Sequence, residues 1–291
     1  MPWPEEEGRR MSAEAPRVYI YGIIRANEDG KEPIVPLLKG LAGNPVRTIG
    51  GDGLAALVSM LATPAAGTPF EESLKNPEQA KSLILDHHRV LQSLIDKRTV
   101  LPVRFGALFT DNDKVSDTLR EHCHGILEAF ERVEGAREWG LKIYCDRSVL
   151  RGHLCEGAPA MLAAQSELAA AKQGRAFFLQ RQIARLGEEE AERAIARCIE
   201  ASRERLCGAV RADASLKLQS ADVHGRAGEM VWNGAFLVAK NAEERFFAMI
   251  GELLRIHGPH GFHYETTGPW PPFSFADCRF EEKQDGCRNG A

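Results

Sequence analysis

The sequence predicts an α+β protein of two domains, each built around an antiparallel sheet. Short β-branched and aromatic runs, such as Arg17–Ile24, alternate with segments of helical periodicity. A stretch rich in glycine, proline and alanine at about residues 150–160 separates two such patterns. With 291 residues, the chain is long enough to bury two hydrophobic cores. We therefore expect one domain over residues 16–147 and a second over residues 148–280.

For the first domain we expect a ferredoxin-like fold of the βαββαβ type with an extra hairpin. Asp52-Gly53 lies between two apolar runs, which is typical of a tight hairpin turn. Asn76-Pro77 is a helix start, with an N-cap followed by proline at the first helical position. The expected strands cover residues 17–24, 46–49, 54–59, 99–109 and 140–145, and the expected helices cover residues 77–97 and 114–133.

The first of these helices carries a histidine pair next to an acid, Asp86-His87-His88. Such a group resembles part of a general-base arrangement. However, His88 falls on the apolar face of the helix with Ile84, Leu91 and Ile95. We therefore expect His88 to be buried and hydrogen-bonded to a strand.

For the second domain we expect a helical pair and a small antiparallel sheet. The helices are expected over residues 161–186 and 188–210, and the strands over 216–218, 229–239 and 262–267. A further helix is expected to run to His257 from an N-cap at Asn241, with Glu244 at capping-box spacing. The polar ends, residues 1–15 and 281–291, are expected to be a disordered arm and a disordered tail.

Composition narrows the class of function. The net charge is -4, so no basic excess favours binding to nucleic acid or to a membrane surface. No apolar run reaches the length of about 18 residues that a membrane span needs. The seven cysteines are scattered and odd in number, which favours reduced thiols in a cytoplasmic protein.

The segment Gly51–Ala56 formally matches the glycine-rich dinucleotide fingerprint. That fingerprint needs a helix that opens at the second glycine, so that its N-terminus faces the pyrophosphate. The stretch before Thr63-Pro64 is too short for a crossover helix. We favour the hairpin, and a nucleotide-dependent enzyme is the alternative.

Three histidines lie within seven residues at His257, His260 and His263, which raises the possibility of a metal site. Glycine and proline between them indicate a turn from a helix to a strand. No cysteine or carboxylate stands nearby at a standard ligand spacing. We favour the turn, and a metal-binding protein is a second alternative.

Two segments are not explained by ordinary core packing. In Leu101–Phe109, proline stands early in a strand, Arg104 points away from its apolar neighbours, and Gly106 permits a bulge. In Gly268–Phe275, three prolines stiffen an extended chain that carries large aromatic side chains. Such a strip suits either sealing of its own domain or docking of a partner. The candidate partner-binding residues are Arg104, Phe105, Trp270 and Phe273.

No sequence motif of a hydrolase, a zinc peptidase or a phosphate-binding loop occurs in the chain. Catalysis therefore has no positive support. We expect a non-enzymatic protein that works by binding, with no catalytic residues, no cofactor and no metal.

These segments carry a resemblance to a known family. Leu101–Phe109, the helix that contains His88, the segment Gly174-Arg-Ala-Phe-Phe-Leu179 and Gly268–Phe275 together resemble the gas vesicle protein F/L family. The strands Val18–Ile24 and Leu54–Ser59 also stand where that family has them, and the resemblance covers about residues 16–277.

The resemblance implies an accessory or minor structural protein of gas vesicle assembly. It also implies a two-domain α+β architecture with a ferredoxin-like N-terminal domain. The implied partners are the small hydrophobic shell protein and other gas vesicle accessory proteins, and the implied location is the gas vesicle within the cytoplasm.

Overall fold

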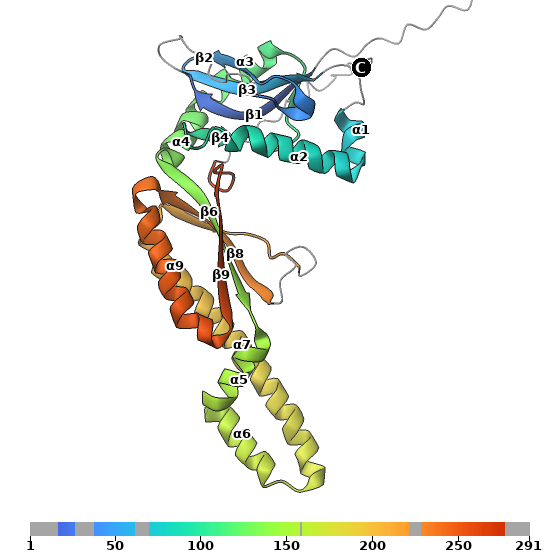
Figure 1. Ribbon diagram of the computed structural model, residues 1–291, viewed down its shortest axis with the longest axis vertical. Coiled ribbons are helices and arrows are strands. Elements are labelled where there is room, and N and C mark those ends of the chain that lie inside the picture. The colour runs from blue at the N-terminus through green and yellow to red at the C-terminus, as the bar shows by residue number, and fades with distance from the viewer. Residues whose placement is uncertain (1–16, 27–37, 62–69, 158, 221–227, 277–291) are drawn as a thin grey trace, which may run out of the picture. The chain divides into compact units, whose positions relative to one another are not determined.

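The computed structural model describes residues 17–26, 38–61, 70–157, 159–220 and 228–276. The described residues up to Glu134, together with those from Pro271, form one compact unit, and Gly135–Trp270 form another. Each unit contains helices and one antiparallel sheet (Figure 1). The expected disordered arm and tail lie outside the described residues.

The sheet of the first unit has five strands, all paired antiparallel. Its order is β2-β3-β1-β4, and β5 also pairs with β1. The hairpin predicted at Asp52-Gly53 is confirmed, since both residues have positive φ, 55° and 77°. The strands are β1 Arg17–Arg25, β2 Arg47–Gly51, β3 Leu54–Leu61, β4 Val100–Pro102 and β5 Leu108–Phe109.

The helix start predicted at Asn76-Pro77 is confirmed, because the Asn76 side chain accepts hydrogen bonds from the amides of Glu78 and Gln79. The single helix expected over residues 114–133 is instead two helices that meet at His122. The helices of this unit are α1 Phe70–Lys75, α2 Pro77–Gln92, α3 Asn112–Glu121 and α4 Cys123–Val133.

The ferredoxin-like topology stays a prediction. Along the described chain, β1, β2 and β3 are followed by α1 and α2, then by β4 and β5, and then by α3 and α4. Residues 27–37 and 62–69, which connect several of these elements, lie outside the description.

The sheet of the second unit has four strands in the order β7-β8-β6-β9, again antiparallel. The strand expected at Gly140–Cys145 to close the first domain is present, but it belongs to β6 and pairs with β8 and β9 in this sheet. The strand expected at residues 216–218 is wrong, because the edge strand ends at Ser215. The strands are β6 Ala136–Cys145, β7 Ala212–Ser215, β8 Glu229–Ala239 and β9 Phe262–Trp270.

The expected pair of helices is present, but the predicted break is in the wrong place. A single helix, α7, runs from Gln173 to Cys207 through Gly187, because one glycine costs a helix only about 1 kcal/mol. The break lies at residues 170–172, between α6 and α7. These two helices pack side by side as a hairpin (Figure 1). The remaining helices are α5 Arg147–Gly157, α6 Pro159–Ala169 and α9 Glu243–His257.

The predicted cap at Asn241 is wrong, since Lys240–Ala242 form a 3-10 turn and Ala242 stands at the N-cap of α9. The helix α9 buries one face, which includes Phe246, Met249 and Leu253, in the core of the second unit. Among the helices in the described ranges, none combines the length and the apolarity that crossing a membrane requires.

Candidate functional site

Two tyrosines of β1 organise the core of the first unit. Tyr19 and Tyr21 are two residues apart, so they point to the same face of the sheet, and both are fully buried. Their rings meet edge to face at 4.9 Å. The Tyr21 hydroxyl donates to Ser59 Oγ at 2.9 Å and accepts from the amide of Leu41 at 2.8 Å. Burial without a nearby cation raises the pKa of each phenol above its ordinary value.

The histidine that packs against this face is His87. Its side chain is 1% exposed, and its Nδ1 lies 2.8 Å from the Tyr19 hydroxyl. A buried histidine that is hydrogen-bonded to a strand was predicted, and the structure contains one. The residue is His87 and not the predicted His88, which is only half-buried. The predicted apolar face was offset as well, since Ile84 is exposed and Val90 is buried instead.

The imidazole of His87 is held in its neutral form. Burial, followed by the neighbouring His88, lowers its pKa, the backbone of Val103 opposes the shift, and the net pKa is about 4. Since the amide of Gly106 donates to the Tyr19 oxygen at 3.3 Å, the phenol proton is free to point to Nδ1. This network assigns the remaining ring proton to Nε2. His87 therefore acts as a structural hydrogen-bond acceptor.

The expected strand over residues 99–109 is interrupted in its centre. β4 ends at Pro102 and β5 begins at Leu108, and both strands pair with β1. The loop between them contains a turn at Phe105 and Gly106, and Gly106 adopts a φ of 100° in it. The loop exposes Arg104 and turns Phe105 back toward the core, where it is half-buried.

Phe105 closes an aromatic cluster around His87. Its ring lies 5.7 Å from the His87 ring, 6.1 Å from that of Tyr19 and 5.8 Å from that of Phe70. Phe273 comes from the other end of the chain, and its ring lies 5.3 Å from that of His88 and 6.4 Å from that of His87. We name Tyr19, Phe70, His87, Phe105 and Phe273 the His87 cluster.

The structure thus brings three of the four candidate contact residues into one unit. Arg104 and Phe105 stand in one loop, and Phe273 belongs to the same cluster as Phe105. Trp270 ends β9 of the second unit, is exposed, and donates from Nε1 to Thr267 Oγ1 at 3.1 Å. The strip Gly268–Phe275 is therefore shared, with residues up to Trp270 in the second unit and residues from Pro271 in the first.

Gly51–Ala56 lies in a hairpin and not at the start of a helix. Gly51 ends β2, and Leu54 begins β3 directly after the turn. A strand, and not a helix, opens after the second glycine, so this segment lacks the helix N-terminus that the fingerprint needs for dinucleotide binding.

The three histidines of residues 257–263 stand on three different elements. His257 ends α9, His260 closes a 3-10 turn, and His263 lies in β9. In the parts of the chain that the structure describes, no three histidine, cysteine or acidic side chains gather closely enough to hold a metal ion.

Sequence reasoning did not single out Phe177 and Phe178 as contact residues. They are adjacent on α7 near its start, and their side chains are 58% and 72% exposed. Arg181 covers the Phe177 ring at 5.8 Å. The sequence did hold a signal for this exposure. Side chains of adjacent helical residues point about 100° apart, so a narrow apolar face cannot bury two neighbouring phenylalanines.

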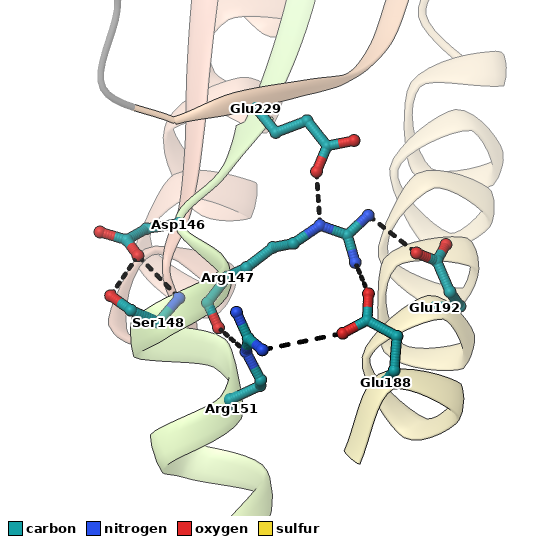
Figure 2. Close-up of polar contacts among 7 residues, drawn as sticks. All are labelled: Asp146, Arg147, Ser148, Arg151, Glu188, Glu192 and Glu229. Carbon is teal, nitrogen blue, oxygen red and sulfur yellow. Dashed lines mark hydrogen bonds and ion pairs between the residues drawn. The ribbon is translucent and has the colours of Figure 1, made fainter. Parts of the chain in front are cut away.

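A group of ion pairs joins α5 and α7 to the sheet of the second unit. Arg147 begins α5, and its guanidinium contacts Glu188 at 2.9 Å and Glu192 at 2.7 Å on α7, as well as Glu229 of β8 (Figure 2). Asp146 caps the same helix end by accepting from Ser148. The hydrogen bond to Glu229, followed by that to Glu192, raises the pKa of Arg147. We name Arg147 and its three glutamates the Arg147 hub.

The features of the first unit are thus a buried tyrosine–histidine network on one face of the sheet and a loop that exposes Arg104. The whole described chain matches one family model. The model named gas vesicle synthesis protein GvpL/GvpF matches residues 17–277. The chain belongs to this family, and membership supports a role in gas vesicle assembly.

Curated relatives agree over nearly the full length. Gas vesicle protein L of Streptomyces sp. (strain CB03234) is 28% identical over 268 residues, which are 91% of this chain and 94% of the relative. Gas vesicle protein F of the same strain is also 28% identical, over 89% of this chain and 99% of the relative. The chain is thus equally similar to an L and an F protein of one organism.

Two solved structures share the fold. The crystal structure of gas vesicle protein GvpF from Anabaena sp. PCC7120 has a TM-score of 0.69 and 18% identity, covering 91% of this chain and all of that one. GvpF from Microcystis aeruginosa has a TM-score of 0.63 and 20% identity, covering 90% and 99%. The expected mixture of helices with antiparallel sheets is confirmed by this likeness.

Proposed function

We propose that this protein is a non-enzymatic assembly factor that binds the major gas vesicle shell protein and prevents its premature aggregation or nucleates its assembly. Membership of the family supports a role in gas vesicle assembly. The observation that carries the binding role is the loop of residues 103–107, which presents Arg104 to solvent beside the half-buried ring of Phe105.

The physical need for such a partner follows from the shell. A shell that keeps water out must have a strongly apolar inner face, and its free subunits are an aggregation hazard. A water-exposed protein that covers this face, or that adds a strand to an open sheet edge, controls when subunits meet.

The proposed contact surface of the first unit consists of Arg104 and Phe105 with Phe273. Trp270, exposed on the second unit, is a separate candidate contact residue. The rings of Phe105 and Phe273 are held by the His87 cluster, so little side-chain entropy is lost when a partner covers them. Aromatic and arginine side chains are the types that dominate binding energy at protein interfaces.

The test uses the full chain and purified shell protein. Light scattering follows shell-protein aggregation after dilution from denaturant, with and without this protein, and co-purification reports binding. We expect a delayed rise in scattering and a stable complex. If the scattering curve is unchanged and no complex forms, the proposal is wrong.

Paired variants locate the surface. Arg104→Ala should weaken the complex about tenfold or more, since interface arginines often contribute above 1.4 kcal/mol. Lys97→Ala removes another exposed cation of the same unit and should have little effect. Equal binding by both variants, with unchanged circular dichroism spectra, would remove Arg104 from the contact surface.

A further inference from the structure

The second unit contains a cavity of about 370 Å³ that none of the functional assignments above uses. Helices α5, α7 and α9 and the turn before β9 form its walls. This volume lies in the range of small-molecule sites, about 300–1,000 Å³. The lining residues are Leu150, His153, Leu154, Ala194, Arg197, Cys198, Ala201, Ile256, His257, His260 and Phe262.

Three imidazole rings converge on this cavity. The rings of His153 and His260 stack at 4.1 Å with an angle of 31°. Each imidazole ring carries at least one N–H donor, which an anion in the cavity could accept from. Burial, followed by the nearby His260, lowers the pKa of His257.

A permanent cation completes the polar side of the cavity. Arg197 on α7 has neither an ion pair nor a hydrogen bond with any residue that the structure describes. The arginines near it on the same helix are paired. Arg193 contacts Glu190 at 2.6 Å, and Arg205 contacts Glu252 at 2.6 Å. The guanidinium of Arg197 is thus free to accept a bidentate anion.

The rest of the lining is apolar. Leu150 and Phe262 are buried, Leu154 is half-buried, and Ile256 is exposed, so Leu154 and Ile256 offer the apolar surface that a ligand could cover. An inorganic anion would leave this apolar surface without a partner. A ligand with an apolar stem would bury it at about 25 cal/mol per Å².

We propose that this cavity binds a small organic carboxylate, with the carboxylate on Arg197 and the histidine rings and the apolar stem against Leu154 and Ile256. The size of the cavity favours a free small molecule over a partner protein, because a stable protein interface buries at least about 1,000 Å². A metal is a poor fit, since in the described chain no set of three ligating side chains converges.

Calorimetric titration of the full chain with four probes at one fixed pH tests the proposal. Hexanoate should bind saturably. Acetate lacks the stem, 1-hexanol lacks the charge, and inorganic phosphate is an anion without a stem, so each should bind at least about tenfold more weakly. Hexanoate should also shift the ring signals of His153, His257 and His260 in nuclear magnetic resonance spectra.

Variants on one helix provide the matched control. Arg197→Gln should weaken hexanoate binding about tenfold or more, Arg197→Lys should restore part of it, and Arg193→Gln should leave it within about twofold. The proposal is overturned if hexanoate does not saturate, if any other probe binds as tightly, or if Arg197→Gln binds like the unmodified chain. It is also overturned if the sites shifted by hexanoate lie outside the cavity.

Discussion

The Tyr19 hydroxyl and Nδ1 of His87 share a hydrogen bond of 2.8 Å between residues that are 68 positions apart in sequence. The bond joins the central strand β1 to the helix α2, and both partners are buried. It is therefore a tertiary contact on which the packing of the first unit depends.

Tyr19→Phe should destabilise the first unit by about 1–3 kcal/mol, because it leaves the buried Nδ1 of His87 without a donor. Urea denaturation followed by fluorescence measures the shift in midpoint. The double variant Tyr19→Phe/His87→Leu removes both partners and should cost less than the sum of the two single changes. Strict additivity would mean that the two groups do not interact.

Acid should weaken the first unit through His87. Its pKa is about 4 when folded and 6.5 in the unfolded reference, so between these values the unfolded chain binds more protons. The free energy of unfolding should therefore fall as the pH falls from about 6.5 to about 4, by up to about 3 kcal/mol.

His87→Leu isolates this contribution, because the other titrating groups remain. The pKa values of His88 and His257 are also lowered, so these residues add a dependence of the same sign in both proteins. The stability of the variant should change less steeply over this pH range. Parallel stability curves for the two proteins would contradict the burial of a neutral His87.

Arg147→Met should loosen the Arg147 hub. The change leaves three glutamates without their shared cation, and since these carboxylates are about half exposed, the expected cost is only about 1–2 kcal/mol. Hydrogen exchange should accelerate at the start of α5 and around Glu188 on α7. High salt should reduce the difference from the unmodified chain.

The control for this change is Arg151→Met. Arg151 lies one turn further along α5, is more exposed, and contacts Glu188 only at 3.8 Å. Its loss should cost no more than about 0.5 kcal/mol. If both variants are equally stable, the hub contributes nothing beyond an ordinary surface ion pair.

Gly268→Ala should destabilise the second unit by about 1–3 kcal/mol. Gly268 has a φ of 123°, and a Cβ there would stand 3.0 Å from the carbonyl oxygen of Glu138. Gly152→Ala is the matched control, since that glycine lies within α5 with open space around its Cβ position and the change should stabilise by up to about 1 kcal/mol. Thermal unfolding measures both, and effects of the same sign would refute this interpretation.

Local signals in the sequence were enough for features that depend on local chemistry. Asp52-Gly53 determined a hairpin because few residue pairs accept two positive φ angles in succession. Asn76-Pro77 fixed a helix start because the cap and the proline act within one turn. Gly106, where the sequence permits a bulge or a close backbone approach, has a φ of 100° in the turn between β4 and β5.

Features that depend on long-range packing could not be predicted from local sequence. Nothing within Ala136–Cys145 says which sheet it joins, since an apolar strand pairs equally well with either neighbour until tertiary packing decides. The prediction buried His88 where the structure buries His87, and this error also has a tertiary cause. Adjacent helical residues differ by about 100°, so a small rotation of α2 against β1 changes which ring is buried.

The candidate site was predictable in part. The aromatic and glycine content of Leu101–Phe109 identified the loop, but nothing near it in sequence connects it with Phe273, which is 168 residues later than Phe105 by number. Phe177 and Phe178 were missed because periodicity alone does not reveal that a helix side faces solvent.

The chain leaves the first unit after Glu134 and returns to it at Pro271, which has a consequence for synthesis on the ribosome. The second unit has been translated in full before Phe273 exists, so the His87 cluster lacks one of its rings until then. The proposed contact surface built on Phe105 and Phe273 therefore cannot form until the whole second unit has been synthesised.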